Sequence, residues 1–174
     1  MRKSAVLLLA SLLVGGIVVG GQASLATGKR SPKILEFDTM VGVPRPYTGA
    51  TNAIRGVLGG GLPWVVDSAK GELRVDGRLE VEVEGLVIDP ADPAAIAAGV
   101  AGKNPAPNFM AIVSCLSKDA GGNAITANVQ TGLFPADAAG NSEIEDTVSL
   151  PEPCIAPIVF VTSPGGAWFA ATGL

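Results

Sequence analysis

Residues 71–88, which read GELRVDGRLEVEVEGLVI, decide the fold of this chain. Apolar residues alternate with charged ones on both sides of Asp76 and Gly77, and a period of two is the pattern of a half-buried β-strand. Asp-Gly between two such runs favours a tight turn. The stretch therefore predicts an antiparallel hairpin with one face in the core.

The length of the turn sets the register of this hairpin. A two-residue turn would place Leu73 opposite Glu80, so that the apolar residues of the two strands would point to opposite faces. A three-residue loop from Val75 to Gly77 places Leu73 opposite Leu79, with Gly77 in the left-handed conformation next to a bulge. Because a single buried face requires the second arrangement, we predict the three-residue loop.

Other short β-rich runs are separated by glycine and proline along the whole chain. Besides the hairpin, strands are expected at 33–40, 63–67, 109–117, 124–132, 142–150, 157–162 and 167–172. A further short strand at 53–57 would interrupt the long glycine-rich connection 47–62. The run 109–117 is apolar on both faces, which indicates a central strand. The pattern predicts an all-β fold, an antiparallel β-sandwich or barrel of about eight strands.

One short helix is expected in addition to the strands. Asp92 is suited to the N-cap and Pro93 to the first helical position, while Gly99 or Gly102 is suited to the end. The helix therefore covers little more than the alanine-rich run between them.

The first 26 residues have the order of a secretory signal peptide. Arg2 and Lys3 supply the positive charge, 5–19 is almost entirely apolar, and small residues follow as far as Ala26. The alternative is an uncleaved membrane anchor. Glycines interrupt the apolar run, however, and a spanning helix needs about 20 mostly apolar residues.

Two cleavage points fit the small residues of this leader, one before Ser24 and one before Thr27, and we favour the second. Residues 1–26 are then the signal peptide and 27–174 form a single all-β domain. The mature protein is expected to be secreted or associated with the cell envelope, with no integral membrane span after cleavage.

Composition narrows the function classes. The chain has 12 basic and 16 acidic residues and no histidine. Cleavage would remove two of the basic residues, and an acidic surface argues against binding nucleic acid, which depends on Lys and Arg at phosphates. The absence of histidine removes the usual general base and the commonest ligand of transition metals. We expect no catalytic residue, no cofactor and no metal centre of this kind.

Cys115 and Cys154 are the two cysteines of the chain. An even pair in an oxidising compartment predicts a disulfide. It would close a loop of about 40 residues and contribute about 4 kcal/mol in the chain-entropy model. A catalytic thiol would need a base to form the thiolate, and no histidine can supply one.

Three glutamates, Glu80, Glu82 and Glu84, lie at alternate positions and so share one face of a strand. Neighbours on one face are about 7 Å apart, a separation found between the carboxylates of inverting glycosidases. One carboxyl of such a pair must be kept protonated in a dry pocket, and nothing in the sequence indicates a pocket. We therefore interpret these glutamates as a solvated face.

Two groups of oxygen-bearing residues could bind a structural calcium ion. One is Asp89 with Asp92. The other consists of Asp137, Asn141, Glu143, Glu145 and Asp146. Neither has the spacing of a known calcium loop, and an Asp before Pro usually forms a turn or a cap.

Aromatic residues offer a third possibility. Trp168 and Phe169 are adjacent on an expected strand and so point to opposite faces. One is expected in the core, and the other is exposed, at an edge, or covered by a loop or a partner. A sugar-binding module would need an exposed platform that includes Trp168 or Trp64.

The runs 71–88 and 150–162 resemble those of secreted bacterial β-domain proteins, which implies a fold and no activity. Together these features predict a non-catalytic structural or interaction module with a protein partner or self-association. The alternatives are a secreted carboxylate-dependent hydrolase and a module that binds a small ligand or carbohydrate.

Overall fold

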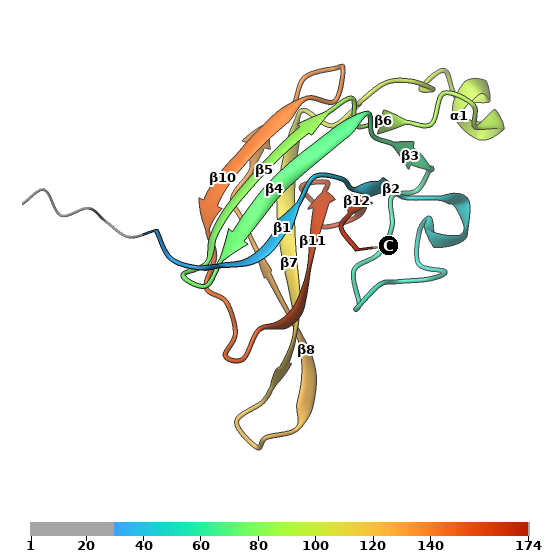
Figure 1. Cartoon of the computed structure of the whole chain (residues 1–174). Helices are drawn as coiled ribbons and strands as arrows, with labels where there is room; N and C mark the ends of the chain where they lie inside the picture. Colours follow the sequence, from blue (N-terminus) through green and yellow to red (C-terminus); the bar gives the residue numbers. More distant parts are fainter. Residues whose placement is uncertain (1–29, 174) are drawn as a thin grey trace, which may run out of the picture. The chain divides into compact units, whose positions relative to one another are not determined.

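Two antiparallel sheets pack against each other in residues 30–173, the part of the chain that the computed structural model describes (Figure 1). The four-stranded sheet has the order β1 (Lys33–Phe37), β4 (Ser68–Arg74), β5 (Arg78–Glu84) and β10 (Ser142–Thr147). The larger sheet has the order β2 (Val41–Gly42), β12 (Trp168–Ala171), β11 (Ile155–Thr162), β7 (Asn108–Lys118) and β8 (Ala124–Gln130), and β9 (Phe134–Pro135) also pairs with β7. The architecture is a β-sandwich.

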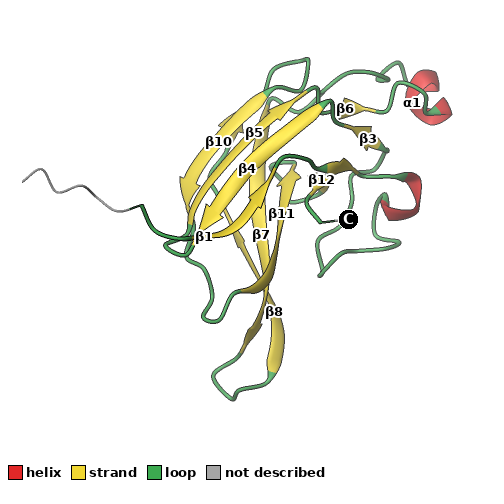
Figure 2. Cartoon of the chain, in the orientation of Figure 1, coloured by secondary structure: helices red, strands yellow, loops and turns green. Residues whose placement is uncertain are grey.

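Short elements complete the structure at one side of the sandwich. Strands β3 (Trp64–Val65) and β6 (Val87–Ile88) form a small separate sheet. Figure 2 shows the two helical elements, α1 (Pro93–Ala97) and the 3-10 turn η1 (Arg45–Tyr47), outside the two large sheets. Within residues 30–173 no helix is long and apolar enough to cross a membrane. The predicted leader lies outside the described residues.

The register of the hairpin β4–β5 is the one predicted from the sequence. Leu73 stands opposite Leu79, and the Gly77 N–H donates to the Arg74 carbonyl at 2.9 Å across a three-residue loop. Gly77 has a φ of +85°, in the left-handed region. A Cβ there would also lie 1.9 Å from the Val148 carbonyl oxygen, so no other residue fits at this position.

The expected helix is confirmed as α1. The Asp92 carboxylate accepts a hydrogen bond of 2.9 Å from the Ala95 N–H, and Pro93 occupies the first turn. The sequence does not predict the turn η1, because three residues around a proline are too few to show a helical periodicity.

Among the described residues, eight strands have four or more residues, in agreement with the expected number. The strand expected at 53–57 is wrong. This segment contains only an isolated bridge between Ile54 and Val57, and it belongs to a long connection that packs on the larger sheet. The central position of β7 is confirmed, since it pairs with β11 on one side and with β8 and β9 on the other.

The main core lies between the two sheets. The four-stranded sheet contributes its apolar alternate residues, and β7, β11 and β12 contribute theirs. The fully buried members include Leu73, Leu79, Val83, Phe109, Val113, Ile144, Val159 and Val161. Burial of a side chain of this size contributes about 1.5–3 kcal/mol. The packing of this layer therefore fixes the two sheets, and with them the charged and polar side chains on their outer faces.

Candidate functional site

The outer face of the four-stranded sheet carries the glutamates singled out in the sequence. Glu80 and Glu82 are half-buried and Glu84 is exposed, opposite in direction to the buried residues of the same strand. All three point away from the core, as expected, but only Glu84 is as solvated as the interpretation from the sequence required.

The structure also brings in glutamates from other strands. Glu80 stands directly between Glu72 of β4 and Glu145 of β10, and Glu36 of β1 stands opposite Glu72. A row of four glutamates thus crosses all four strands. Like charges directly opposite one another destabilise a sheet, and this row could not be found from the sequence because its members are distant along the chain.

Basic side chains offset one end of this row. Lys33 Nζ lies 2.6 Å from carboxylate oxygens of both Glu36 and Glu72, and Arg74 also pairs with Glu72. These contacts lower the pKa of Glu72, chiefly through the hydrogen bond from Lys33, and they raise the pKa of Lys33, chiefly through the hydrogen bond to Glu36. Neither Glu80 nor Glu145 has an ion pair with the described residues.

A second, shorter row runs beside the first. It consists of Lys70, Glu82 and Glu143: Glu82 stands between the other two, and Lys70 Nζ lies 2.8 Å from its carboxylate. The hydrogen bond to Glu82 raises the pKa of Lys70. Glu82 is thus held by a cation on one side and faces a carboxylate on the other.

The surface above these rows is a depression lined by residues of all four strands, among them Phe37, Gly71 and Val81. The carboxylates stand side by side on a sheet face rather than on two facing walls. A catalytic acid needs a raised pKa, whereas the ion pairs of Glu72 lower the pKa of that carboxyl. Glu72 is therefore held in its charged form by Lys33 and Arg74.

The acidic residues considered for calcium are occupied within the protein. Asp92 caps α1 and pairs with Arg45, and the hydrogen bond from Arg45 is the main reason why the pKa of Asp92 is lowered. Asp89 accepts from the Ala91 N–H at 2.8 Å in a turn. Asp89 and Asp92 are thus used for local structure.

The second calcium group is divided between two places. Asp137 accepts from the backbone and side-chain amides of Asn141, and the backbone hydrogen bond is the main cause that lowers the pKa of Asp137. Asp146 accepts from the Gly132 N–H at 2.8 Å, while Glu143 and Glu145 point from the sheet face. Within residues 30–173 no three His, Cys, Asp or Glu residues are arranged to hold a metal ion.

The tryptophans do not form an exposed platform. Trp64 stacks on Phe169 with ring centroids 3.8 Å apart, and Phe169 meets Phe109 edge-on in the core. Trp168 is fully buried on the other face of the sheet, where it contacts Phe160 and Tyr47. The pair Trp168 and Phe169 thus points to opposite faces, as predicted, and a loop covers the outer member.

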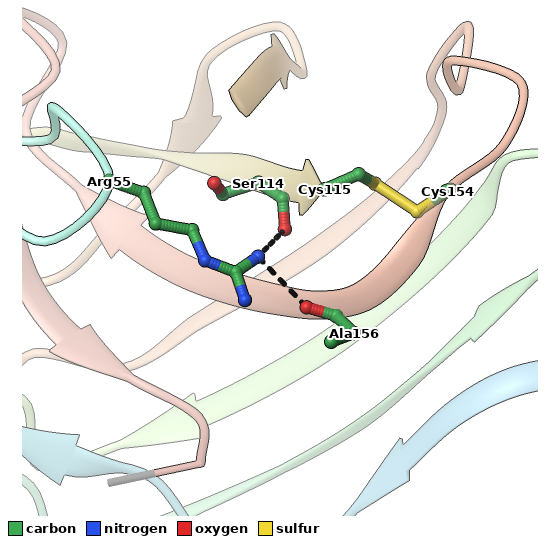
Figure 3. The surroundings of a disulfide bond; sticks show 5 residues. All are labelled: Arg55, Ser114, Cys115, Cys154 and Ala156. Carbon is green, nitrogen blue, oxygen red and sulfur yellow. Dashed lines mark hydrogen bonds between the residues drawn. A yellow bond between two sulfur atoms is a disulfide. The ribbon is translucent and has the colours of Figure 1, made fainter. Parts of the chain in front are cut away.

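The predicted disulfide is present. Cys115 and Cys154 are joined with a Cα–Cα distance of 5.0 Å, and the bond connects central strand β7 to the segment that enters β11 (Figure 3). Cys115 is fully buried and Cys154 is partly buried. The disulfide therefore fixes the start of β11 to its neighbour β7.

Next to the disulfide, Arg55 replaces part of the ladder between β7 and β11. The register of the two strands shifts between Ile155 and Ile158, and Pro157 in the shifted segment has no N–H to donate. Arg55 Nη1 donates to the Ser114 carbonyl at 2.9 Å and to the Ala156 carbonyl at 2.8 Å (Figure 3). The sequence showed no sign of this contact, because Arg55 lies in a glycine-rich connection.

Beyond the disulfide, β7 and β8 continue as a hairpin that projects past the sandwich (Figure 1). We call residues 116–126 the arm. It carries exposed apolar side chains, with Leu116 43% and Ile125 39% exposed, and Ile155 of β11 lies opposite Leu116 and is 52% exposed. The sequence predicts the strands and the turn of this hairpin, but no pattern in it predicts that the hairpin extends beyond the core.

Strand β8 forms one edge of the larger sheet and pairs with β7 alone. Its sequence, AITANVQ, has neither a charged residue nor a proline. Proteins usually protect an edge strand with such residues because its free backbone groups can pair with another strand.

No family model, no curated protein and no solved structure matches this chain.

Proposed function

We propose that this protein is a non-catalytic structural or interaction module that is secreted or held in the cell envelope and acts through the edge of β8. The observation that carries the proposal is an uncharged, proline-free edge strand whose first residues, 124–126, belong to the arm that projects from the sandwich. An extended strand added to such an edge gains main-chain hydrogen bonds without any catalytic group.

The chemistry of the acidic face also supports a non-catalytic role. The chain has no histidine, and the carboxylates of the outer face lie in rows beside one another rather than across a cleft. The buried tryptophans give no support to a sugar platform. The hydrolase remains the alternative to test, since Glu80 and Glu82 share a depression.

Activity assays on the purified chain decide between these roles. We expect no turnover of glycan or ester substrates above the buffer rate. If turnover is found and is lost in Glu80→Gln or Glu82→Gln but kept in the matched control Glu84→Gln, the protein is a hydrolase and the proposal is wrong. Each variant removes one charge from the outer face and leaves the core unchanged, so the three variants can be compared in the same fold.

The proposed location has a separate test. A bacterium that expresses the chain is fractionated and the exported form is sequenced from its N-terminus. We expect the mature protein to begin at Thr27 or Ser24 and to contain no free thiol under denaturing, non-reducing conditions. Retention of the intact chain in the cytoplasm with two free thiols would contradict the proposal, because the bond between Cys115 and Cys154 needs an oxidising compartment.

A further inference from the structure

Resting on the proposed function, we infer that the partner of the β8 edge is a second copy of this chain, paired antiparallel with the first about a twofold axis at Ala127. The two copies then share one continuous sheet. The inference follows from which backbone groups of β8 are free, which side chains flank them, and how the remaining edges of the molecule differ.

The free backbone groups of β8 are identified by its pairing with β7. The Thr131 N–H donates to the Ala111 carbonyl at 3.0 Å, so Thr131 is directed towards β7. Residues alternate in direction along an antiparallel pair. The outward set is therefore Ala124, Thr126, Asn128 and Gln130, and their backbone groups have no hydrogen-bond partner among the described residues.

These outward residues are complementary to a copy of themselves. In an antiparallel pairing centred on Ala127, Thr126 stands opposite Asn128 of the second copy, and Ala124 opposite Gln130. Each such pair consists of two outward residues, so every free N–H meets a free carbonyl. Only this register pairs all four outward residues of one copy with the four outward residues of the other about a single twofold axis.

The side chains favour the same register. It places Ile125, which is 39% exposed, opposite Val129 of the second copy, and the twofold axis repeats this pair. Ala127 meets its own copy at the centre, where side chains approach closely and a small residue fits best. Apolar cross-strand pairs of this kind stabilise a sheet.

Charge distinguishes this edge from both edges of the four-stranded sheet, and the opposite edge of its own sheet, β2, has only two residues. The chain has an excess of acidic residues, so two copies repel each other across most surfaces. Strand β10 presents Glu143, Glu145 and Asp146, and β1 carries Lys33 and Glu36. The seven residues of β8 carry no charge, and β8 belongs to the larger sheet, whereas the acidic face belongs to the four-stranded sheet.

Sedimentation velocity of the purified full chain across a concentration series is the test. We expect a reversible dimer. Thr126→Lys should weaken the dimer at least about tenfold, because it places a charge against the paired strand, while the uncharged control Thr126→Gln should leave the dissociation constant within about twofold. Because the two variants differ only at residue 126, a difference between their dissociation constants cannot come from any other segment of the chain.

A charge pair checks the register. Combining Thr126→Lys with Asn128→Glu puts opposite charges against each other twice across the twofold axis, so the dimer should recover. In a register shifted by one pair, two introduced lysines or two introduced glutamates would face each other and no recovery would occur. Asn128 also donates to the Arg55 carbonyl at 3.1 Å, so the melting temperature of Asn128→Glu is measured alongside.

Amide hydrogen exchange gives an answer without any substitution. The amides of Thr126, Asn128 and Gln130 should exchange more slowly as the concentration of the wild-type chain rises. A monomer at all concentrations with unchanged exchange, or equal dissociation constants for Thr126→Lys and Thr126→Gln, would overturn the inference. Hydrolase activity lost in Glu80→Gln from an intact dimer would instead refute only the proposed function.

Discussion

Strands β10 and β8 are both edges of the sandwich, and they are built in opposite ways. Strand β10 reads SEIEDT and β8 reads AITANVQ. The first carries three acidic residues beside an acidic sheet face, whereas the second is uncharged and only its first residues lie on the arm. Because charge on an edge discourages pairing with another strand, β10 has this protection and β8 lacks it.

Support from the interior differs in the same way. Strand β10 lies over the core, and its Ile144 is fully buried. The arm lies beyond the core and is held at its base by the disulfide and by Arg55. Variants that remove these supports, or that change the charges of the acidic face, therefore test the difference between the two edges directly.

Removal of the disulfide should have the largest effect. The double variant Cys115→Ala/Cys154→Ala is expected to lose about 4 kcal/mol of unfolding free energy, because the unfolded chain is no longer closed into a loop. Urea denaturation followed by circular dichroism measures the loss. Reductant should lower the midpoint of the wild type and leave that of the double variant unchanged, and equal midpoints for the two oxidised proteins would contradict the prediction.

Loss of the Arg55 contacts should come next. Arg55→Met keeps the length of the side chain but leaves the Ser114 and Ala156 carbonyls without their donor, which costs about 1–3 kcal/mol. Arg78→Met is the control, since Arg78 is an exposed arginine on β5. The prediction fails if the two variants unfold at the same urea concentration.

Relief of like charge on the acidic face should stabilise the protein slightly. Glu80→Gln removes a carboxylate that stands between Glu72 and Glu145, and we expect a gain of about 0.5 kcal/mol. Glu84→Gln is the control because Glu84 stands opposite Ser68. Both midpoints are measured at low salt and at about 1 M salt, where screening should reduce the gain. A loss of stability in Glu80→Gln would show that the carboxylate has a structural partner.

The pH dependence carried by Asp92 should be the smallest effect. The pKa of Asp92 is lower in the folded protein, mainly because of Arg45, so the folded state binds fewer protons there than the unfolded state. Its contribution is present above the ordinary aspartate pKa of about 3.9 and disappears as the pH falls through the lower folded-state value.

Asp92→Asn keeps a residue that caps helices well and removes this dependence. The Tm of the variant should therefore fall less than that of the wild type when the pH is lowered from about 5 to about 2. Asp38→Asn, at an exposed position, is the control. If the wild type and Asp92→Asn lose the same number of degrees over this range, the ion pair with Arg45 contributes nothing to folding.

Local patterns predicted the elements that local physics controls. The β4–β5 register followed from the requirement for one buried face, and α1 followed from Asp92 and Pro93. The strand expected at 53–57 failed for the opposite reason. Its short apolar pattern was too brief to distinguish a strand from a connection, and Arg55 is placed there by contacts with β7 and β11.

The candidate surfaces show the same division. The shared face of Glu80, Glu82 and Glu84 was visible along one strand, but the row through Glu36, Glu72 and Glu145 depends on pairings between distant segments. The uncharged composition of β8 could be read from the sequence. Its position at the edge of the sheet, and the projection of its first residues beyond the core, could not.

By itself, the amino-acid sequence determined an all-β chain with one short helix and one pair of cysteines, because alternation, capping and cysteine number act over a few residues or by simple count. Only the tertiary structure decided which strands meet, which edge stays open and which carboxylates become neighbours. These depend on how distant segments share one core, and no local pattern records that arrangement.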